Sequence, residues 1–370
     1  MQIGVYGSGY LGTVISACLA DFGTPVTCCD SEASRILEMA QGKVRFFEKN
    51  LEEVIRRNVR AGRLVYSTDL ESFARRAGII FFAHDSSDKL GEIAVRVAEL
   101  AYKPPVLVIV TPVPVGTAAR VLKQLSAAGK KAILVSQPVF LTNGCAMEDF
   151  NWPDRIVLGT ASNDAIQMLK QIYHPLVMRG VPLIITNHET AELVREAATA
   201  FIATKISFIN EIAALCEHVN ADAVHLSLAL GLDKKIGPRC LQAGAGMGGR
   251  FAHSDMDSLA ELAGNKGIDL KVLAAARAVN NDLAERLVNK IAQMLRSIDN
   301  KEIGILGLAF KPNTNSVAGS SSLQLAQSLL ARGARVHAYD PVAIPEARLQ
   351  LNGAVKYCES PYAAAERADA

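Results

Sequence analysis

Residues 2–12 read Gln-Ile-Gly-Val-Tyr-Gly-Ser-Gly-Tyr-Leu-Gly, which places glycines at positions 7, 9 and 12 directly after a short apolar run. The apolar run, Gln2 to Tyr6, predicts a strand, and the spacing of apolar residues after Gly12 predicts a helix that ends at Gly23. In such a turn Gly7 permits the tight bend, Gly9 lets the backbone approach a pyrophosphate, and Gly12 permits close helix packing. The amides of Tyr10 and Leu11 then lie at a helix N-terminus, where they can bind phosphate.

A second strand, Val26–Cys29, follows the helix and ends at Asp30. A carboxylate at this position accepts hydrogen bonds from ribose hydroxyls and repels a 2′-phosphate, so the sequence favours NAD over NADP. The alternative is a nucleotide-binding fold that binds nothing. The surrounding order of strand, turn, helix, strand and acid favours binding.

The alternation of strands and helices continues beyond this motif and predicts a parallel, doubly wound sheet. Buried strands are expected at 78–83, 106–110, 132–135 and 181–185. A long, mostly apolar helix from Thr190 to about Val219 follows, and a second α/β unit begins at Glu302. We therefore predict an α/β protein with two Rossmann-like parallel-sheet domains joined by a long central helix. Three domains are expected. Residues 1–189 bind the dinucleotide, residues 190–297 form a helical connector and dimerisation region, and residues 298–370 form a second Rossmann-like domain that binds a nucleotide sugar and could be incomplete.

Composition excludes several classes of function. Half of the 370 residues are hydrophobic, 21% are charged and the net charge is +2, which favours neither nucleic acid nor a membrane surface as a partner. The longest continuous apolar run, Val106–Val110, is too short to span a membrane, and no leader precedes the first strand, so we expect a cytoplasmic protein. The seven cysteines have no metal-site spacing, and no metal is expected. Cys240 lies near a glycine-rich segment but is more simply interpreted as a small packing residue.

Five further motifs extend over the chain. They are Pro138-Val-Phe-Leu-Thr-Asn-Gly144, Trp152-Pro-Asp-Arg-Ile-Val157, Lys205-Ile-Ser-Phe-Ile-Asn-Glu211, Ile236-Gly-Pro-Arg239 and Gly307-Leu-Ala-Phe-Lys-Pro-Asn-Thr314. Together with the glycine-rich turn, they closely resemble the UDP-glucose/GDP-mannose dehydrogenase family over essentially the whole chain. The resemblance implies two Rossmann-like domains, dimerisation through the long helix, and oxidation of a nucleotide sugar at C6 to a carboxylate with two NAD. In that reaction a cysteine forms a thiohemiacetal and then a thioester.

The catalytic residues of the family are almost all replaced. The resemblance aligns the catalytic cysteine with Phe251, and the lysine and asparagine of the central helix with Arg195 and Thr199. It aligns the glutamate of the PEFL motif with Val139 and the following glutamate with Asn143. The threonine of the STVP motif aligns with Pro112. Only the aspartate is retained, as Asp255. Phenylalanine cannot form a thioester, and arginine stays protonated and cannot shuttle protons. Removing a single catalytic group typically costs about 10²–10⁴ in rate, so six losses predict a pseudoenzyme.

The ligand-binding positions are better preserved. The resemblance implies that Gly7, Gly9, Tyr10, Leu11, Gly12, Asp30 and Arg35 bind NAD, and that Phe140, Leu141, Lys235, Arg239, Gly248, Phe310 and Lys311 bind a UDP- or GDP-linked sugar, with Lys235 reaching across a homodimer. Two positions depart from the family. A small strand-end loop is replaced by His84-Asp-Ser-Ser87, where Asp85 would repel a pyrophosphate, and an acidic and arginine-containing cluster is replaced by 315–319.

Two other interpretations stay open. His253 beside Asp255 and Arg250 could form a new acid/base pair for a two-electron oxidation or reduction together with Arg195, or His253 could be a surface turn residue. The chain could also be a structural partner that binds an active paralogue through the long helix. The sequence favours a regulatory or binding pseudoenzyme connected with polysaccharide precursors.

Overall fold

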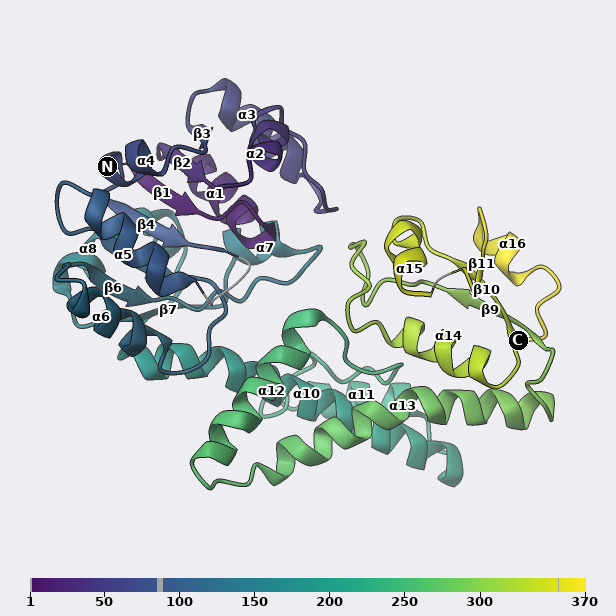
Figure 1. Cartoon of the computed structure of the whole chain (residues 1–370). Coiled ribbons are helices and arrows are strands. Elements are labelled where there is room, and N and C mark those ends of the chain that lie inside the picture. The colour runs from purple at the N-terminus through teal and green to yellow at the C-terminus, as the bar shows by residue number, and fades with distance from the viewer. Residues whose placement is uncertain (1, 85–88, 352) are drawn as a thin grey trace. The chain divides into compact units, whose positions relative to one another are not determined.

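The computed structural model describes residues 2–84, 89–351 and 353–370, and for residues 250–253 it describes only the backbone. The chain divides into two compact units, Met1–Arg195 and Glu196–Ala370. The division falls within the long helix α10 (His188–Val219), which belongs to both units (Figure 1). The finer division at 189/190 and 297/298 stays a prediction.

The first unit is built around an eight-stranded sheet in the order β3-β2-β1-β4-β5-β6-β7-β8. The first six strands have the order of a dinucleotide-binding fold. All neighbouring strands are parallel except β6 and β7, which are antiparallel. The strands are β1 (Ile3–Tyr6), β2 (Val26–Cys29), β3 (Leu64–Ser67), β4 (Ile79–Phe82), β5 (Val106–Ile109), β6 (Ile133–Ser136), β7 (Ile156–Gly159) and β8 (Leu183–Thr186).

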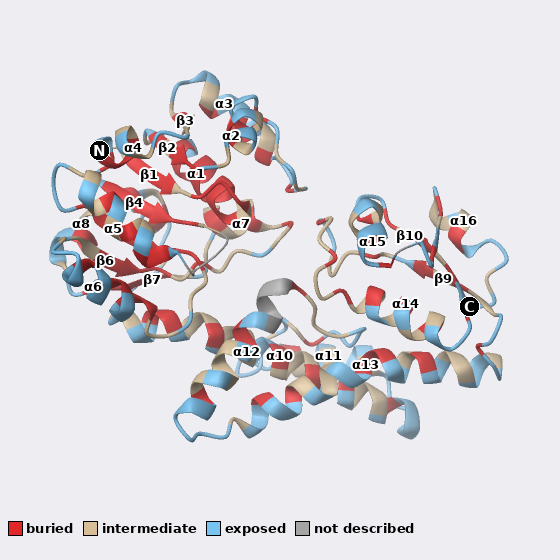
Figure 2. Ribbon diagram, viewed as in Figure 1, coloured by how far each residue is buried: buried red, intermediate tan, exposed pale blue. Residues whose placement is uncertain are grey.

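Helices cover both faces of this sheet. Alternate residues of β4 pack on opposite faces: Ile79 and Phe81 belong to one apolar core, and Ile80 and Phe82 to another. The central strands are consequently buried throughout (Figure 2), and the predicted parallel doubly wound sheet is confirmed. The helices are α1 (Tyr10–Asp21), α2 (Ala33–Ala40), α3 (Leu51–Arg60), α4 (Leu70–Arg76), α5 (Leu90–Leu100), α6 (Thr117–Ala127), α7 (Ala146–Asn151), α8 (Asn163–Ile172) and α9 (His174–Val177).

One expectation about this sheet is wrong. The segment 181–185 was expected to be a buried strand, but β8 is the last strand of the sheet, and Ile184 and Ile185 are 47% and 45% exposed. An apolar run of this length predicts a strand but not its position, because burial depends on whether another strand or helix covers it.

The second unit combines helices with a small sheet. The helices are α11 (Ala223–Leu232), α12 (Arg250–Asn265), α13 (Lys271–Leu295), α14 (Ser321–Ala331), α15 (Ile344–Leu351) and α16 (Pro361–Ala365). The strands β9 (Glu302–Leu306), β10 (Arg335–Tyr339) and β11 (Lys356–Tyr357) form a parallel sheet in the order β11-β10-β9. Residues of α13 and α14 pack against it, so the predicted second Rossmann-like unit is confirmed.

Helix α10 is long and apolar enough to cross a membrane by length and composition, although continuous apolar runs in the sequence did not show this. One such helix is weak evidence for a membrane span. Two of its polar residues are buried within the second unit: Ser207 donates to the carbonyl of Ala276 at 2.7 Å, and the Asn210 carboxamide accepts from the Gly244 amide at 2.9 Å. These contacts attach one face of α10 to the rest of the second unit, while apolar residues elsewhere on the helix are exposed.

The cysteines form no disulfide, since all seven are free. Within the described residues no group of three or more His, Cys, Asp or Glu could hold a metal ion. Cys240 has a positive φ of 63° in the loop after α11.

Candidate cofactor and nucleotide-sugar site

The glycines of the first turn are required by close backbone contacts. Gly7 has φ +105°, and a Cβ atom there would lie 2.7 Å from the Ala83 carbonyl oxygen. A Cβ atom on Gly12 would lie 2.0 Å from the Gly7 carbonyl oxygen. Any side chain at either position would therefore displace the backbone, which explains the pattern from which the fold was predicted.

The N-terminus of α1 can receive an anion. Gly9 is its N-cap residue and makes no side-chain capping hydrogen bond, and the first turn contains no acidic residue. The first amides of a helix have no partner within the helix, and they attract phosphate electrostatically. The turn formed by Gly9, Tyr10 and Leu11 therefore fits the pyrophosphate of a dinucleotide.

Asp30 lies at the end of β2, beside this turn, as predicted. Its carboxylate accepts from the Ser8 amide and the Ser8 hydroxyl, both at 2.7 Å, and from the Glu32 amide at 3.0 Å. Burial raises the pKa of Asp30, but these hydrogen bonds and Arg35, 3.8 Å away, outweigh it and leave the pKa below its usual value. The carboxylate is thus charged, as contact with an NAD ribose requires. The sequence analysis did not identify Ser8, because its role depends on β2.

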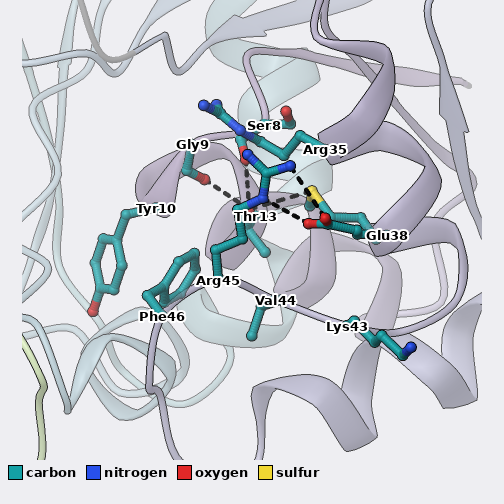
Figure 3. A pocket seen from close by; sticks show the side chains of 11 residues that line it. Ser8, Gly9, Tyr10, Thr13, Arg35, Glu38, Lys43, Val44, Arg45 and Phe46 are labelled. Atoms are coloured by element: carbon teal, nitrogen blue, oxygen red, sulfur yellow. Dashed lines mark hydrogen bonds and ion pairs between the residues drawn. The ribbon is translucent and has the colours of Figure 1, made fainter. Parts of the chain in front are cut away.

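A cavity of about 160 Å³ adjoins the turn (Figure 3). Tyr10 and Phe46 form one wall, with ring centroids 4.7 Å apart. Arg45 crosses the opening and pairs with Glu32 and Glu38, each at 2.6 Å. The remaining lining residues come from the turn before α1, from α1, from α2 and from the segment between α2 and α3: Ser8, Gly9, Thr13, Arg35, Met39, Lys43 and Val44.

Two of the substituted family positions, Pro112 and Arg195, line one small cavity after β5 and β6, together with Glu192. Glu192 is buried and accepts from the Gly116 amide at 2.7 Å and the Ala118 amide at 2.8 Å. Burial raises the pKa of Glu192. The two amide hydrogen bonds and one from Ser136 lower it by less, so the pKa stays above its usual value. Glu192 therefore ties α10 to the N-terminus of α6, a role that the sequence analysis did not identify.

The loop after β6 contains three predicted site residues with different environments. Val139 is 9% exposed and belongs to the apolar core. Leu141 is partly buried against the same core. The guanidinium of Arg155 lies over the Phe140 ring, 3.6 Å from its centroid. The position of the family glutamate is thus occupied by a core residue.

In the second unit the structure brings Thr199 and Asp255 together. Asp255 is buried in α12, and the Thr199 hydroxyl donates to its carboxylate at 3.0 Å. The predicted residues Arg250, Phe251 and His253 lie in the first turn of α12, but their side chains are outside the described residues, as is Asp85 in the first unit. One retained and one substituted family position are therefore in direct contact.

The glycine-rich segment before α12 is held by two asparagines that the sequence analysis did not identify. Asn210 accepts from the Gly244 amide, and Asn280 accepts from the Met247 amide at 2.6 Å. A Cβ atom on Gly249 would lie 3.0 Å from the Phe310 ring. The predicted residues Gly248 and Phe310 consequently lie next to each other, which a distance of about 60 positions in the sequence does not reveal.

The predicted basic residues differ in exposure. Lys235 and Arg239 are exposed between α11 and the glycine-rich segment, while Lys311 is half-buried beside Phe310. In the substituted segment 315–319, Asn315 donates a hydrogen bond to Glu346.

Comparisons with known proteins agree with this arrangement. Residues 1–177, 189–282 and 304–370 match the NAD binding, central and UDP binding domains of the UDP-glucose/GDP-mannose dehydrogenase family. The UDP-glucose 6-dehydrogenase TuaD of Bacillus subtilis (strain 168) is 37% identical over 381 residues, which cover 100% of this chain and 82% of the relative. The UDP-glucose 6-dehydrogenase of Rhizobium meliloti (strain 1021) is 35% identical over 386 residues, with 100% and 88% covered.

Solved structures show the same likeness. A UDP-glucose dehydrogenase from the archaeon Pyrobaculum islandicum superposes with a TM-score of 0.94 at 31% identity, covering 100% of this chain and 88% of that one. A UDP-D-ManNAc dehydrogenase from Pyrococcus horikoshii shares the fold, with a TM-score of 0.81 at 20% identity and coverage of 92% and 84%. The match to an NAD binding domain confirms the predicted cofactor, NAD.

Proposed function

Because this chain belongs to the UDP-glucose/GDP-mannose dehydrogenase family, we propose that it binds NAD and a nucleotide sugar without catalysing the four-electron oxidation at C6. The observation that carries the proposal is the environment of the substituted positions. Val139 packs in the apolar core, and Thr199 donates a hydrogen bond to the retained Asp255. These two substituted side chains, Val139 and Thr199, therefore have packing and hydrogen-bond partners of their own.

The chemistry supports the same conclusion. Oxidation to a carboxylate requires a nucleophile to capture the aldehyde, and Phe251 provides none. Valine and proline at 139 and 112 can neither accept nor donate a proton through their side chains. Arg195 can stabilise an anion but does not exchange its proton at physiological pH. The binding residues, in contrast, keep the properties that a charged dinucleotide requires, above all the ionised Asp30 and the open N-terminus of α1.

The residues that we propose contact the nucleotide sugar are Phe140, Leu141, Lys235, Arg239, Gly248, Phe310 and Lys311. Cationic groups suit a diphosphate, and an aromatic ring suits a base. A UDP-linked sugar is the first choice, because residues 304–370 match a UDP binding domain and the relatives are named UDP-glucose 6-dehydrogenases.

The proposal includes a cytoplasmic homodimer formed through α10. Phe201, Phe208 and Leu215 are 68%, 51% and 55% exposed and follow one another at intervals of seven residues, so they lie on one face of the helix. An apolar face of this kind marks an interaction surface. A second copy of the chain would cover it and would bring Lys235 towards the partner's site.

An active enzyme with altered chemistry is the second candidate, and the buried carboxylate of Asp255 favours it. A two-electron oxidation of an alcohol needs a base and NAD but no thiol. A structural partner of an active paralogue is the third candidate, and it would use the exposed face of α10. The number of NADH formed for each sugar identifies the second candidate, and ligand binding separates the first candidate from the third.

The test combines binding and turnover. Thermal unfolding is measured with NAD(H), NADP(H) and a panel of UDP- and GDP-sugars, where a ligand at 100 times its Kd stabilises the protein by about 2.7 kcal/mol. NADH formation is then compared for the native protein, for Phe251→Cys, and for a variant that also carries Arg195→Lys, Thr199→Asn and Val139→Glu.

We expect binding without turnover in the native protein and in Phe251→Cys, because the thiol alone lacks the lysine, asparagine and glutamate around it. Two NADH per sugar from either protein would refute the proposal. One NADH per sugar would support the second candidate, and binding of neither ligand would support the third.

A further inference from the structure

The segment between α2 and α3 contains a buried acid that the proposed chemistry does not use. Glu48 is 6% exposed and lies at the end of residues 43–48, which we call the strap. One oxygen of Glu48, Oε2, accepts from the Tyr10 hydroxyl at 2.6 Å and from the Gly144 amide at 2.7 Å. These donors are 38 positions before and 96 positions after Glu48 in the sequence.

The two donors belong to the two halves of the proposed site in the first unit. Tyr10 is the first residue of α1, in the turn that faces the pyrophosphate of NAD. Gly144 ends the loop 138–144, which carries Phe140 and Leu141. A single carboxylate oxygen therefore connects the cofactor turn to the loop proposed to contact the nucleotide sugar.

The strap is fixed at several points. Arg45 pairs with Glu32 and Glu38, and the Val44 amide donates to Glu52 at 3.3 Å. The Phe46 ring packs against the Tyr10 ring, as Figure 3 shows. Glu48 thus follows three consecutive residues of the strap that are each held by a contact, so a displacement of one donor is not absorbed by free movement of the acid.

The hydrogen bond from Tyr10 is maintained over the physiological pH range. Burial, with the hydrogen bond to Glu48, raises the pKa of the Tyr10 phenol above its usual value. The phenol therefore stays protonated and donates. A buried carboxylate carries a desolvation cost that an apolar residue of similar volume would avoid, so purely structural packing does not require an acid at this position.

We propose that Glu48 is a positioning residue that couples occupancy of the NAD turn to the position of the loop 138–144, and thereby couples NAD binding to nucleotide-sugar binding. The inference rests on the proposed function for its ligands. When a dinucleotide fixes Tyr10, the shared oxygen of Glu48 fixes the Gly144 amide, and the loop is held for the second ligand. Coupling of this kind is reciprocal, so the sugar also favours NAD.

The experiment has a ligand-free arm and a binding arm. In the first, hydrogen exchange of residues 138–145 is measured in the native protein, in Tyr10→Phe, in Glu48→Ala and in the surface control Glu53→Gln on α3. Tyr10→Phe keeps the ring that packs on Phe46 and removes only the hydroxyl. We expect faster exchange in residues 138–145 for Tyr10→Phe and Glu48→Ala, and native exchange for the control.

In the second arm, NADH affinity is titrated with and without saturating UDP-glucose. We expect the sugar to tighten NADH binding about fivefold or more in the native protein and in the control, in the lower range of allosteric coupling. In Tyr10→Phe the effect should fall below twofold, and Glu48→Gln, which retains an acceptor oxygen, should recover part of it.

Native exchange of residues 138–145 in Tyr10→Phe would overturn the proposal, because the hydroxyl would then not hold the loop. Equal NADH affinity with and without the sugar in the native protein would also overturn it. If the protein binds neither ligand, the proposed function fails, while the exchange arm still decides whether Glu48 connects the turn to the loop.

Discussion

Asp30 is the residue at which we predict that the choice between NAD and NADP is made. Its carboxylate is ionised and held by Ser8 and the Glu32 amide, so it is oriented before any ligand arrives. A fixed carboxylate loses little conformational entropy when it accepts the ribose hydroxyls, and it opposes a 2′-phosphate through charge. Ser8 contributes indirectly to the preference for NAD, because its amide and hydroxyl orient the Asp30 carboxylate.

We therefore expect Asp30→Ala to weaken NAD binding about tenfold or more, since a hydrogen bond to a charged group contributes about 1.5–3 kcal/mol. The native protein should bind NAD more tightly than NADP. Isothermal titration calorimetry of both dinucleotides checks this. Unchanged NAD affinity in the variant, or tighter binding of NADP by the native protein, would show that the ribose lies elsewhere.

At the scale of elements, both units have an aspartate directly after a strand, but the two aspartates have different partners. Asp340 follows β10 as Asp30 follows β2, but its carboxylate accepts from four backbone amides, those of Leu308, Ala309, Val342 and Ala343. Burial raises the pKa of Asp340, and the four amides outweigh this effect and lower it. Asp340 thus connects the turn after β9 to the segment that follows β10, so its role is structural.

A lowered pKa in the folded state gives stability that is present above the unfolded pKa of about 3.9 and is lost as the pH falls through the folded pKa. We expect Asp340→Asn to lower the free energy of unfolding of the second unit by about 1–3 kcal/mol at pH 7. The difference from the native protein should shrink below about pH 4. Hydrogen exchange of residues 302–310 at several pH values measures it. A difference that is constant over this range would exclude the linkage.

At the scale of the whole molecule, α10 carries the surface through which we propose that the chain dimerises. Its apolar residues form more surface than the second unit covers, since Phe201, Phe208 and Leu215 stay exposed while Ser207 on the same helix is buried. Exposed residues of α11, Val224, Leu228 and Leu232, add to the apolar surface of this unit. The homodimer that we propose would cover the apolar residues of α10.

Analytical ultracentrifugation at micromolar concentration should show a dimer. Leu215→Glu should shift it towards monomer, because the interface would bury an unpaired charge. Leu349→Glu on α15 is the matched control, since Leu349 is also exposed, at 81%, but lies far along the chain. If the native protein is a monomer, the proposed interface and the role of Lys235 across it are wrong. The proposed cofactor binding does not depend on this result.

The sequence by itself determined the fold class and the cofactor, and it is the source of the proposed catalytic substitutions. These follow from local chemistry. Only glycine fits the backbone contacts at positions 7 and 12, continuous apolar runs specify the buried strands β4 and β5, and the absence of a thiol at position 251 needs no coordinates. Strands β3, β7 and β11 were not predicted; β3 and β7 have the same length as the predicted strands β4 and β5, so length does not explain why they were missed.

Only the tertiary structure decided which polar residues support the site. The partners of Glu48 lie 38 and 96 positions away, Asn280 holds an amide 33 positions before it, and Ser8 contacts an acid 22 positions after it. It also showed that β8 is an exposed edge and that Val139 is a core residue. Such contacts depend on which strand ends and loops meet in space, and hydrogen bonding and burial at those meeting points leave no periodic trace in the sequence.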